Sequence, residues 1–569
     1  MTWVFTGFFA YMAFILVVGV LAGRRTQGRM ESFYLGDRKV GAWVTAISAS
    51  ASSESGWLVL GCVAMGYVYG VAGYWITIGC VLGFLFNWFF FAERIRRASA
   101  ANGSLTVPEF LERVTGDRTR AIRLIGVVII FVLMFTYVAA QLNAAGVALQ
   151  SIVGWPYWIG VLIGAAVTVL YTTMGGFQAV SWTDLFQGLL MVAALVALPI
   201  AAWVHLGGAA EVESAVRQQP AQPFHVFEGY VGDRYETVRV EEGSPAQFWN
   251  PPHELSLSVD DGIFRVAVDG RPVEVVPEVQ GEVAVSLEPI GLEGSLTKGK
   301  TYEPKPADAF FSLTGGMVGL ILLGWIVEML GIGLGYPGSP HVVARFMAAK
   351  SEREIARGRV IALTWAVLAE GGAITMGILA RALLPDLADP QWGLLKTAEL
   401  FLHPLLVGLI LAAVFAALRS TADSQLLVAS SAVVRDFVGS VLHVRLDDRR
   451  ALRISRIVVL VLGVLAVLLA LSENRFIFWF VLFSWAGLGA SFGPSLILAV
   501  WWRRLSAAGV VASMLVGFST TIVWSLWIRE AIRDAGGPDV YELVPAFALS
   551  LLAALGFSLL FPRRQEGAT

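Results

Sequence analysis

The chain has 569 residues, of which 56% are hydrophobic and 15% are charged. A soluble globular protein carries about a quarter charged residues, so this composition indicates a protein that lies largely in a lipid bilayer. The formal net charge of −2 argues against nucleic acid as a partner. Cys62 and Cys80 both lie in apolar runs and are interpreted as small buried hydrophobic residues, not as a disulfide or a metal site.

About thirteen apolar stretches are long enough for a membrane-spanning helix, which needs roughly 20 residues. In chain order they are approximately 3–22, 42–70, 72–92, 124–150, 156–174, 184–205, 311–336, 359–384, 403–434, 455–472, 476–501, 508–528 and 544–562. The first stretch is followed by Arg24 and Arg25 and lacks the charge order of a cleaved signal, so we expect a retained helix.

Basic residues divide unevenly between the two sides that these helices define. The loops and helix ends on one side, with the C-terminal tail, hold 27 of the 41 Lys and Arg residues, whereas the short loops on the other side hold five. Because positive charge stays on the cytoplasmic side, the pattern predicts an outer N-terminus and a cytoplasmic C-terminus. We expect a multi-pass protein of a bacterial inner membrane, in contact with lipid.

Residues 206–310 separate six predicted helices in 1–205 from seven in 311–569. This segment is too polar to enter lipid and carries 18 acidic residues against eight basic ones. Alternating runs such as RYETVRVEE and EVAVSLEPI, with Asp-Gly pairs nearby, predict β-hairpins. We expect an acidic, β-rich module outside the membrane, although a disordered acidic loop is an alternative that the Val, Ile and Phe content disfavours.

Two predicted helices contain stretches typical of a helix that breaks inside the membrane. One is SASASSESGWLVLG at 48–61, and the other is GIGLGYPGSPH at 331–341, with four glycines and two prolines. Free backbone groups at such breaks bind ions and polar solutes, so the pattern indicates a transporter. The breaks open two successive groups of five helices, which predicts inverted repeats over 42–205 and 311–501. Close packing through small residues is the alternative interpretation.

A third stretch, AALRSTADSQLLVASS at 416–431, places three small residues on one helix face. Ala417, Ser420 and Thr421 are spaced i, i+3 and i+4. Hydroxyls together with the carbonyls of a broken helix make the oxygen shell that a small hard cation such as Na⁺ needs. In the alternative interpretation, these hydroxyls only bond back to their own helix.

At these residues the sequence resembles the sodium/solute symporter family, and most closely its sodium/proline symporters. The matching segments are FYLGDRKVGAWVTAISASASSESGWLVLG, YTTMGGFQAVSWTDLFQ, GLGYPGSPHVVARFMAA, STADSQLLVASSAVVRD, WAGLGASFGPSLILAVWW and YELVPAF. They run in family order over nearly the whole chain, outside 206–310. The resemblance implies an all-α, LeuT-like core of two inverted five-helix repeats. It also implies Na⁺-coupled symport of a small organic solute, with proline or a related amino acid as the first expectation.

The resemblance also implies where the ion and the solute bind. Na⁺ would be held by the backbone of Ala51, Glu54 and Ala417 and by the hydroxyls of Ser420 and Thr421. The solute site would map onto Ser55, Gly56, Trp57, Tyr137, Ile332 and Tyr336. Asp184, at the cytoplasmic start of the sixth helix, matches an acidic residue linked to cation release.

Some positions depart from the family pattern. Ser53 stands where proline symporters have an acidic residue, Ile332 replaces an aromatic residue, and Arg419 replaces a methionine before the Ser-Thr pair. An unpaired charge near the midplane costs roughly several kcal/mol, so Arg419 needs a partner. We predict that this partner is Glu54, with Asp423 or Glu328 as alternatives. The guanidinium then either crowds the cation site or forms a structural pair beside an intact site, and we favour the intact site.

Two other functions remain as alternatives. Arg419 and Glu54 favour a sodium-independent or proton-coupled carrier, whereas the predicted outer module fits a transporter-derived sensor. An enzyme is not expected, because the six His residues are scattered and no nucleophile, metal or phosphate-loop pattern occurs. We expect a small-molecule solute and membrane lipid as the partners, with no obligate protein partner.

Overall fold

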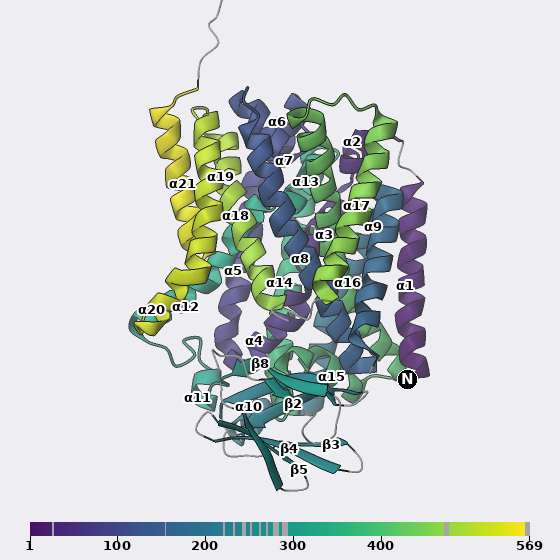
Figure 1. Ribbon diagram of the computed structural model, residues 1–569, viewed down its shortest axis with the longest axis vertical. Helices are drawn as coiled ribbons and strands as arrows, with labels where there is room; N and C mark the ends of the chain where they lie inside the picture. The colour runs from purple at the N-terminus through teal and green to yellow at the C-terminus, as the bar shows by residue number, and fades with distance from the viewer. Residues whose placement is uncertain are drawn as a thin grey trace, which may run out of the picture.

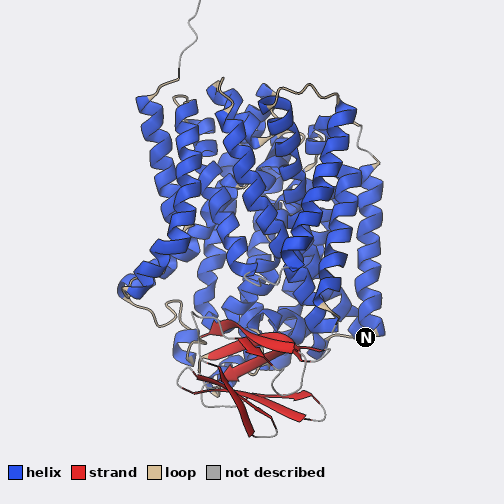
Figure 2. Cartoon of the chain, viewed as in Figure 1, coloured by secondary structure: helices blue, strands red, loops and turns tan. Residues whose placement is uncertain are grey.

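The computed structural model describes all residues except 25–27, 154, 220–221, 232–233, 242–245, 251–252, 261–262, 269–270, 277–283, 287–293, 472–476 and 564–569. The described chain is mostly helical, with long helices in one bundle and the strands gathered at one end of it (Figures 1 and 2). The N-terminus lies at the end with the strands, and α21 runs to the opposite end (Figure 1).

The bundle is built from long helices, several of which are divided into shorter pieces. They are α1 (Thr2–Gly23), α3 (Ala42–Ser53), α4 (Val63–Tyr69), α5 (Tyr74–Leu85), α6 (Ala92–Asn102), α8 (Ala121–Val153), α9 (Tyr157–Leu206), α12 (Gly319–Gly331), α13 (Pro340–Ala348), α14 (Glu352–Leu383), α16 (Pro404–Ser431), α17 (Asp448–Leu471), α18 (Ile477–Trp501), α19 (Ala507–Val523) and α21 (Leu543–Leu560). Shorter helices are α2 (Met30–Leu35), α7 (Val107–Thr115), α10 (Ala209–Arg217), α11 (Ala307–Phe310), α15 (Gly393–Phe401) and α20 (Arg529–Asp534).

Among the described residues, eleven helices are long and apolar enough to cross a membrane, against the thirteen predicted. Trp57–Asn102 is counted as one apolar span, and Tyr157–Leu170 forms a shorter apolar helix. The backbone leaves helical geometry in both regions, since Gly70 has φ 59° and Gly176 has φ 54° and ψ −147°. Glycine adopts such angles with little strain, so these two positions are where the chain bends.

The two breaks predicted in the second and seventh helices are both present. α3 ends at Ser53, Glu54 is extended with φ −100° and ψ 124°, and the chain resumes in the π-helix η2 (Trp57–Cys62). α12 passes into the 3₁₀-helix η6 (Ile332–Gly338), which contains a proline, and Ser339 is extended before α13 begins. Because proline lacks an N–H and 3₁₀ runs are short, the backbone groups around this segment are released from regular helix bonding.

Glycine lets the broken seventh helix approach α18 closely. A Cβ atom at Gly335 would lie 2.1 Å from Nε1 of Trp485, and one at Gly338 would lie 2.5 Å from the carbonyl oxygen of Gly489. Both separations are shorter than real Cβ contacts, so any larger residue would push η6 away from α18.

The strands form two antiparallel four-stranded sheets with orders β2-β1-β8-β7 and β3-β4-β5-β6. They are β1 (Phe224–Val231), β2 (Arg234–Glu241), β3 (Ala246–Asn250), β4 (His253–Asp260), β5 (Ile263–Val268), β6 (Arg271–Val276), β7 (Ala284–Ser286) and β8 (Gly294–Tyr302). The Asp-Gly pairs at 261–262 and 269–270 lie outside the described residues. Arg239 donates to the carbonyl of Pro385 at 2.6 Å, and the Tyr302 hydroxyl donates to Asp389 at 2.8 Å, so the first sheet is fixed to the bundle.

α7 lies toward the end of the bundle opposite the strands (Figure 1), and its Glu109 is buried. Its carboxylate lies 2.7 Å from Arg113, 2.9 Å from Arg435 and 3.5 Å from Arg123. Burial by itself raises the pKa of Glu109, but Arg435, the amide of Leu105 and Arg123 together hold that pKa below its ordinary value.

Candidate ion and solute site

Five oxygen atoms meet where α3 ends against the middle of α16, and they come from the residues predicted to hold Na⁺. The Ser420 hydroxyl donates to the carbonyl of Ala51 at 2.8 Å and lies 3.3 Å from that of Ala417. The Thr421 hydroxyl lies 3.0 Å from the carbonyl of Glu54 and 3.4 Å from that of Ala417. All five residues are buried. We call this group the oxygen cluster.

The oxygen cluster exists because the second helix stops inside the bundle. The last carbonyls of α3 lack the amide partners that a continuing helix would supply, and the hydroxyls of α16 partly replace them. Carbonyl and hydroxyl oxygens each have two lone pairs, so they keep acceptor capacity after these bonds form. A neutral set of hard oxygen atoms, closed off from solvent, suits a small monovalent cation.

The residues after the break in the second helix lie against α8. Trp57 packs against Tyr137, and the amide of Trp57 donates to the Ser55 hydroxyl at 3.3 Å. The amide of Gly56 donates to the Gln141 side chain at 3.2 Å. Trp57 is partly exposed and Tyr137 is buried, so one face of this group is aromatic and the other is polar backbone.

The aromatic residue of η6 reaches the same break from the other side. The Tyr336 hydroxyl donates to Oε1 of Glu54 at 2.7 Å. Its ring meets Phe84 and Trp485 edge-on, with centroids 4.8 Å and 5.0 Å away. Trp485 donates to the carbonyl of Ile332 at 3.1 Å, so Ile332 contributes backbone to this contact. The structure thus brings the predicted solute residues around the two breaks.

Asp184 lies in a buried network that includes an arginine missed by the sequence reasoning. Its carboxylate is 3.0 Å from the guanidinium of Arg345 and accepts hydrogen bonds from Ser48 at 2.7 Å and Ser52 at 3.1 Å. Ser424 bridges this network to the oxygen cluster, because its hydroxyl is 3.1 Å from that of Ser52 and donates to the carbonyl of Ser420 at 2.6 Å.

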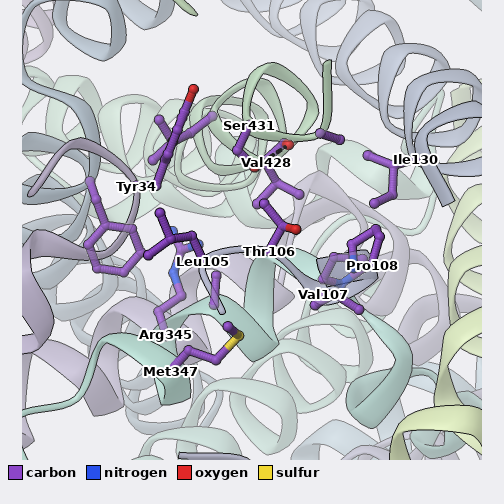
Figure 3. A pocket seen from close by; sticks show the side chains of 15 residues that line it. Tyr34, Leu105, Thr106, Val107, Pro108, Ile130, Arg345, Met347, Val428 and Ser431 are labelled. Atoms are coloured by element: carbon purple, nitrogen blue, oxygen red, sulfur yellow. Dashed lines mark hydrogen bonds between the residues drawn. The ribbon is translucent and has the colours of Figure 1, made fainter. Parts of the chain in front are cut away.

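Arg345 of this ion pair also lines a small pocket beside the first residues of α7 (Figure 3). Arg345 lines it together with Tyr34, Thr106, Val428 and Ser431 (Figure 3). A continuous set of polar side chains therefore leads from the oxygen cluster through the ion pair to a pocket near the end of the bundle opposite the strands.

The prediction that Arg419 pairs with Glu54 is wrong, and so are its two alternatives. Arg419 donates from Nε to the amide oxygen of Gln187 on α9 at 2.8 Å, with the amide oriented by this network. Glu328 instead pairs with Arg529 at 3.0 Å, and Asp423 accepts a hydrogen bond from Ser424 at 3.1 Å.

The physical reason is the geometry of α16. Arg419 is two residues from both Ala417 and Thr421, so it points about 200° around the helix from them. It therefore faces α9, and within the described residues no ion pair joins it to a carboxylate of the break. The guanidinium therefore contacts Gln187 and lies outside the oxygen cluster.

A second buried carboxyl group belongs to Glu370 of α14, whose Oε2 lies 3.9 Å from the thiol of Cys62 on η2. The sequence reasoning missed it. The available signal was an acidic residue inside an apolar run, which is rare and usually functional in a membrane helix.

A bundle of membrane-spanning helices, two of them broken beside a buried oxygen cluster, has the architecture of a secondary transporter. The model of the sodium:solute symporter family matches residues 33–249 and 284–517. The high-affinity proline transporter PutP of Bacillus subtilis (strain 168) is 32% identical over 561 residues, which cover 98% of each chain. The sodium/proline symporter of Escherichia coli (strain K12) is 29% identical over 562 residues, 97% of this chain and 92% of that one.

The chain belongs to the sodium:solute symporter family. Its fold is also that of a solved Na⁺-coupled sialic acid symporter in a substrate-bound outward-open state, with a TM-score of 0.69 at 17% identity and 99% coverage of both chains. The family resemblance seen in the sequence is confirmed, and the chain is a multi-pass membrane protein.

Proposed function

We propose that this chain is a Na⁺-coupled symporter that takes up proline across a bacterial inner membrane. The observation that carries the proposal is the oxygen cluster, in which the carbonyls of Ala51, Glu54 and Ala417 meet the hydroxyls of Ser420 and Thr421. Family membership and two relatives named as proline transporters support the choice of ion and solute.

Na⁺ in this position would connect two parts of the core. Its ligands come from the broken end of α3 and from the continuous helix α16. A cation bound to both α3 and α16 stabilises the conformation in which these two helices lie close together. Na⁺ binding therefore shifts the carrier toward that conformation. This differential affinity is how an ion gradient drives alternating access in carriers with broken helices.

Proline would bind beside the ion, between the two breaks. Its carboxylate fits the Ser55 hydroxyl and the backbone amides that follow α3, while its apolar ring fits between Trp57, Tyr137 and Tyr336. Ile332 adds a buried apolar side chain to this region.

Asp184 would serve cation release toward the cytoplasm. The hydroxyls of Ser52 and Ser424 connect it to the oxygen cluster, and its partner Arg345 lines the pocket beyond. Movement of the ion pair would expose this polar route to the cytoplasmic side.

We further propose thirteen crossings, with inverted repeats over 42–205 and 311–501 and the strands of 206–310 outside the cell. The bends at Gly70 and Gly176 support separate crossings in the two regions that differ from the prediction. The strands and the N-terminus lie at the same end of the bundle (Figure 1). If the strands are outside the cell, the N-terminus is therefore outside as well.

The test is uptake by vesicles reconstituted with the purified chain. Labelled proline, other amino acids and organic acids are offered with an inward Na⁺ gradient or with choline in its place. We expect proline accumulation only with Na⁺. Equal uptake in choline would refute symport, and Na⁺-driven uptake of another solute would refute the assignment of proline.

A further inference from the structure

A basic groove lies on the surface of the bundle beside the first turns of α17, and the transport scheme above does not use it. It is lined by Gly28 from the connection between α1 and α2, by Thr173 of α9 and by six residues of α17. Its volume is about 740 Å³. The groove is therefore large enough to hold a small organic group.

Three arginines of the groove share one face of α17. Arg449, Arg453 and Arg456 are spaced i, i+4 and i+7, and the lining residue Leu460 follows at i+11. At 3.6 residues per turn these four positions lie within about 60° of one another around the helix. All four side chains are exposed. The face thus carries three positive charges in a row and continues in an apolar residue.

No carboxylate of the chain neutralises these three charges. Among the described residues, no acidic side chain lines the groove or forms an ion pair with its arginines. The two nearest acidic residues along the helix have other partners, since Asp447 lies 3.4 Å from Arg450 and Asp448 accepts from the amide of Met30 at 3.5 Å. The groove therefore offers its positive charge to an anion from outside the chain.

The helix surface beyond the arginines is apolar. Ile457, Leu460, Val464 and Leu468 are each more than half exposed. α17 begins at the end of the bundle opposite the strands and runs toward the strands (Figure 1). Positive charge near the bundle end, followed by bare apolar surface toward the middle, matches the order of headgroup and acyl chains in one leaflet of a bilayer. A free phosphate ion would use only the first part of this surface.

We propose that this groove binds one anionic phospholipid of the cytoplasmic leaflet. Its phosphate lies among Arg449, Arg453 and Arg456, and an acyl chain runs along Leu460. Guanidinium groups bind phosphate through charge-assisted hydrogen bonds, often two at once, and basic pockets on the cytoplasmic side suit anionic headgroups. The inference rests on neither the ion nor the solute of the proposed function. It uses the proposed orientation only to choose the leaflet.

The test compares two lipids that differ in net charge. The purified full chain in detergent is titrated with fluorescent phosphatidylglycerol or with phosphatidylcholine that carries the same label and acyl chains. We expect phosphatidylglycerol to bind about 100-fold more tightly at low salt, and this preference should shrink as NaCl is added, because salt screens exposed charges. Soluble glycerol phosphate, the other source of the same headgroup chemistry, should not displace the lipid when the two are at equal concentration.

The diagnostic variant combines Arg449→Gln, Arg453→Gln and Arg456→Gln. We expect its affinity for phosphatidylglycerol to fall about 100-fold, at about fivefold for each arginine, so that it binds the two lipids alike. The binding of phosphatidylcholine should change by less than about threefold in this variant.

The matched control removes three exposed arginines that do not line the groove, by Arg353→Gln, Arg503→Gln and Arg504→Gln. It should stay within about threefold of the natural chain. A second variant, Leu460→Glu, keeps the three groove arginines and places a negative charge where the acyl chain would begin. We expect it to weaken phosphatidylglycerol binding at least about tenfold.

The outcomes decide between the proposal and its alternatives. Equal affinity of the natural chain for the two lipids overturns it, and so does an unchanged affinity in the folded triple variant. Displacement by glycerol phosphate at equal concentration would assign the groove to a soluble anion instead. If the triple variant does not fold, Leu460→Glu and the two lipids on the natural chain decide. Na⁺-driven proline uptake is measured separately, so failure of the lipid site leaves the proposed function standing.

Discussion

Thr421 offers the sharpest single test of the oxygen cluster. Its hydroxyl reaches the carbonyls of Glu54 at 3.0 Å, Ser52 at 3.3 Å and Ala417 at 3.4 Å, so it touches both α3 and its own helix. Thr421→Ala removes this oxygen and leaves carbonyls of the break without a donor. Thr421→Ser keeps the oxygen and removes only a methyl group.

The expected magnitude follows from losing one of five oxygen ligands. An interaction of a hydroxyl with a charged partner contributes about 1.5–3 kcal/mol net. Since about 1.4 kcal/mol corresponds to a factor of ten, Thr421→Ala should weaken apparent Na⁺ affinity about 10- to 100-fold. The assay is the initial rate of proline uptake into vesicles as a function of Na⁺ concentration. The maximal rate at saturating Na⁺ should change much less than the half-saturating concentration.

Two comparisons keep this test specific. Thr421→Ser should stay within about threefold of the natural chain, because it retains the hydroxyl. Thr521→Ala is the matched control, since that buried hydroxyl only donates to Gly517 within α19, at 2.9 Å. An unchanged half-saturating Na⁺ concentration in a folded Thr421→Ala protein would refute the placement of the ion.

Three further predictions concern other parts of the account. Trp57→Ala should lose proline binding. Its thermal unfolding midpoint should stay close to that of the natural chain, because Trp57 is only partly buried. Uptake with an unchanged KM would show that the solute pocket lies elsewhere. Asp184→Asn leaves the buried guanidinium of Arg345 without its carboxylate partner. The substitution should therefore destabilise the chain by about 3–5 kcal/mol and lower the unfolding midpoint in detergent. An unchanged midpoint would contradict the importance of this ion pair. Glu109 has a lowered folded-state pKa, so its stabilising contribution is present above the ordinary value of 4.5 and is lost as pH falls through the lower value. Unfolding midpoints measured between pH 3 and 6 should therefore fall less steeply for Glu109→Gln, and identical slopes would contradict this assignment.

The breaks and the oxygen cluster were predictable because they depend on local residue types. A continuous helix is disfavoured by the run of Ser and Ala before Glu54 and by the segment rich in Gly and Pro near Tyr336. This preference does not depend on what packs against the two segments. The i, i+3, i+4 spacing of Ala417, Ser420 and Thr421 follows from helix geometry alone. The structure places these groups in contact across 369 positions of sequence separation between Ala51 and Ser420.

The errors and omissions concern contacts between distant segments. Arg419 was paired with Glu54 on the cost of a buried charge, without considering that it points away from the face that carries Ser420. Arg345 was missed because it acquires its role only from a partner on another helix, Asp184, which is 161 positions away in the sequence. The predicted helices end near the bends at Gly70 and Gly176. The described chain differs in number because Trp57–Asn102 counts as one apolar span and Tyr157–Leu170 is a shorter helix.

The central claim is that ion and solute cross the membrane together, and the most direct measurement is solute-stimulated ²²Na⁺ influx. Vesicles containing the purified chain are held at zero membrane potential, and ²²Na⁺ influx is followed with and without external proline. The account predicts that proline accelerates ²²Na⁺ influx in the natural chain and fails to do so in Thr421→Ala at the same Na⁺ concentration. Proline influx that proceeds with no added ²²Na⁺ influx would contradict it.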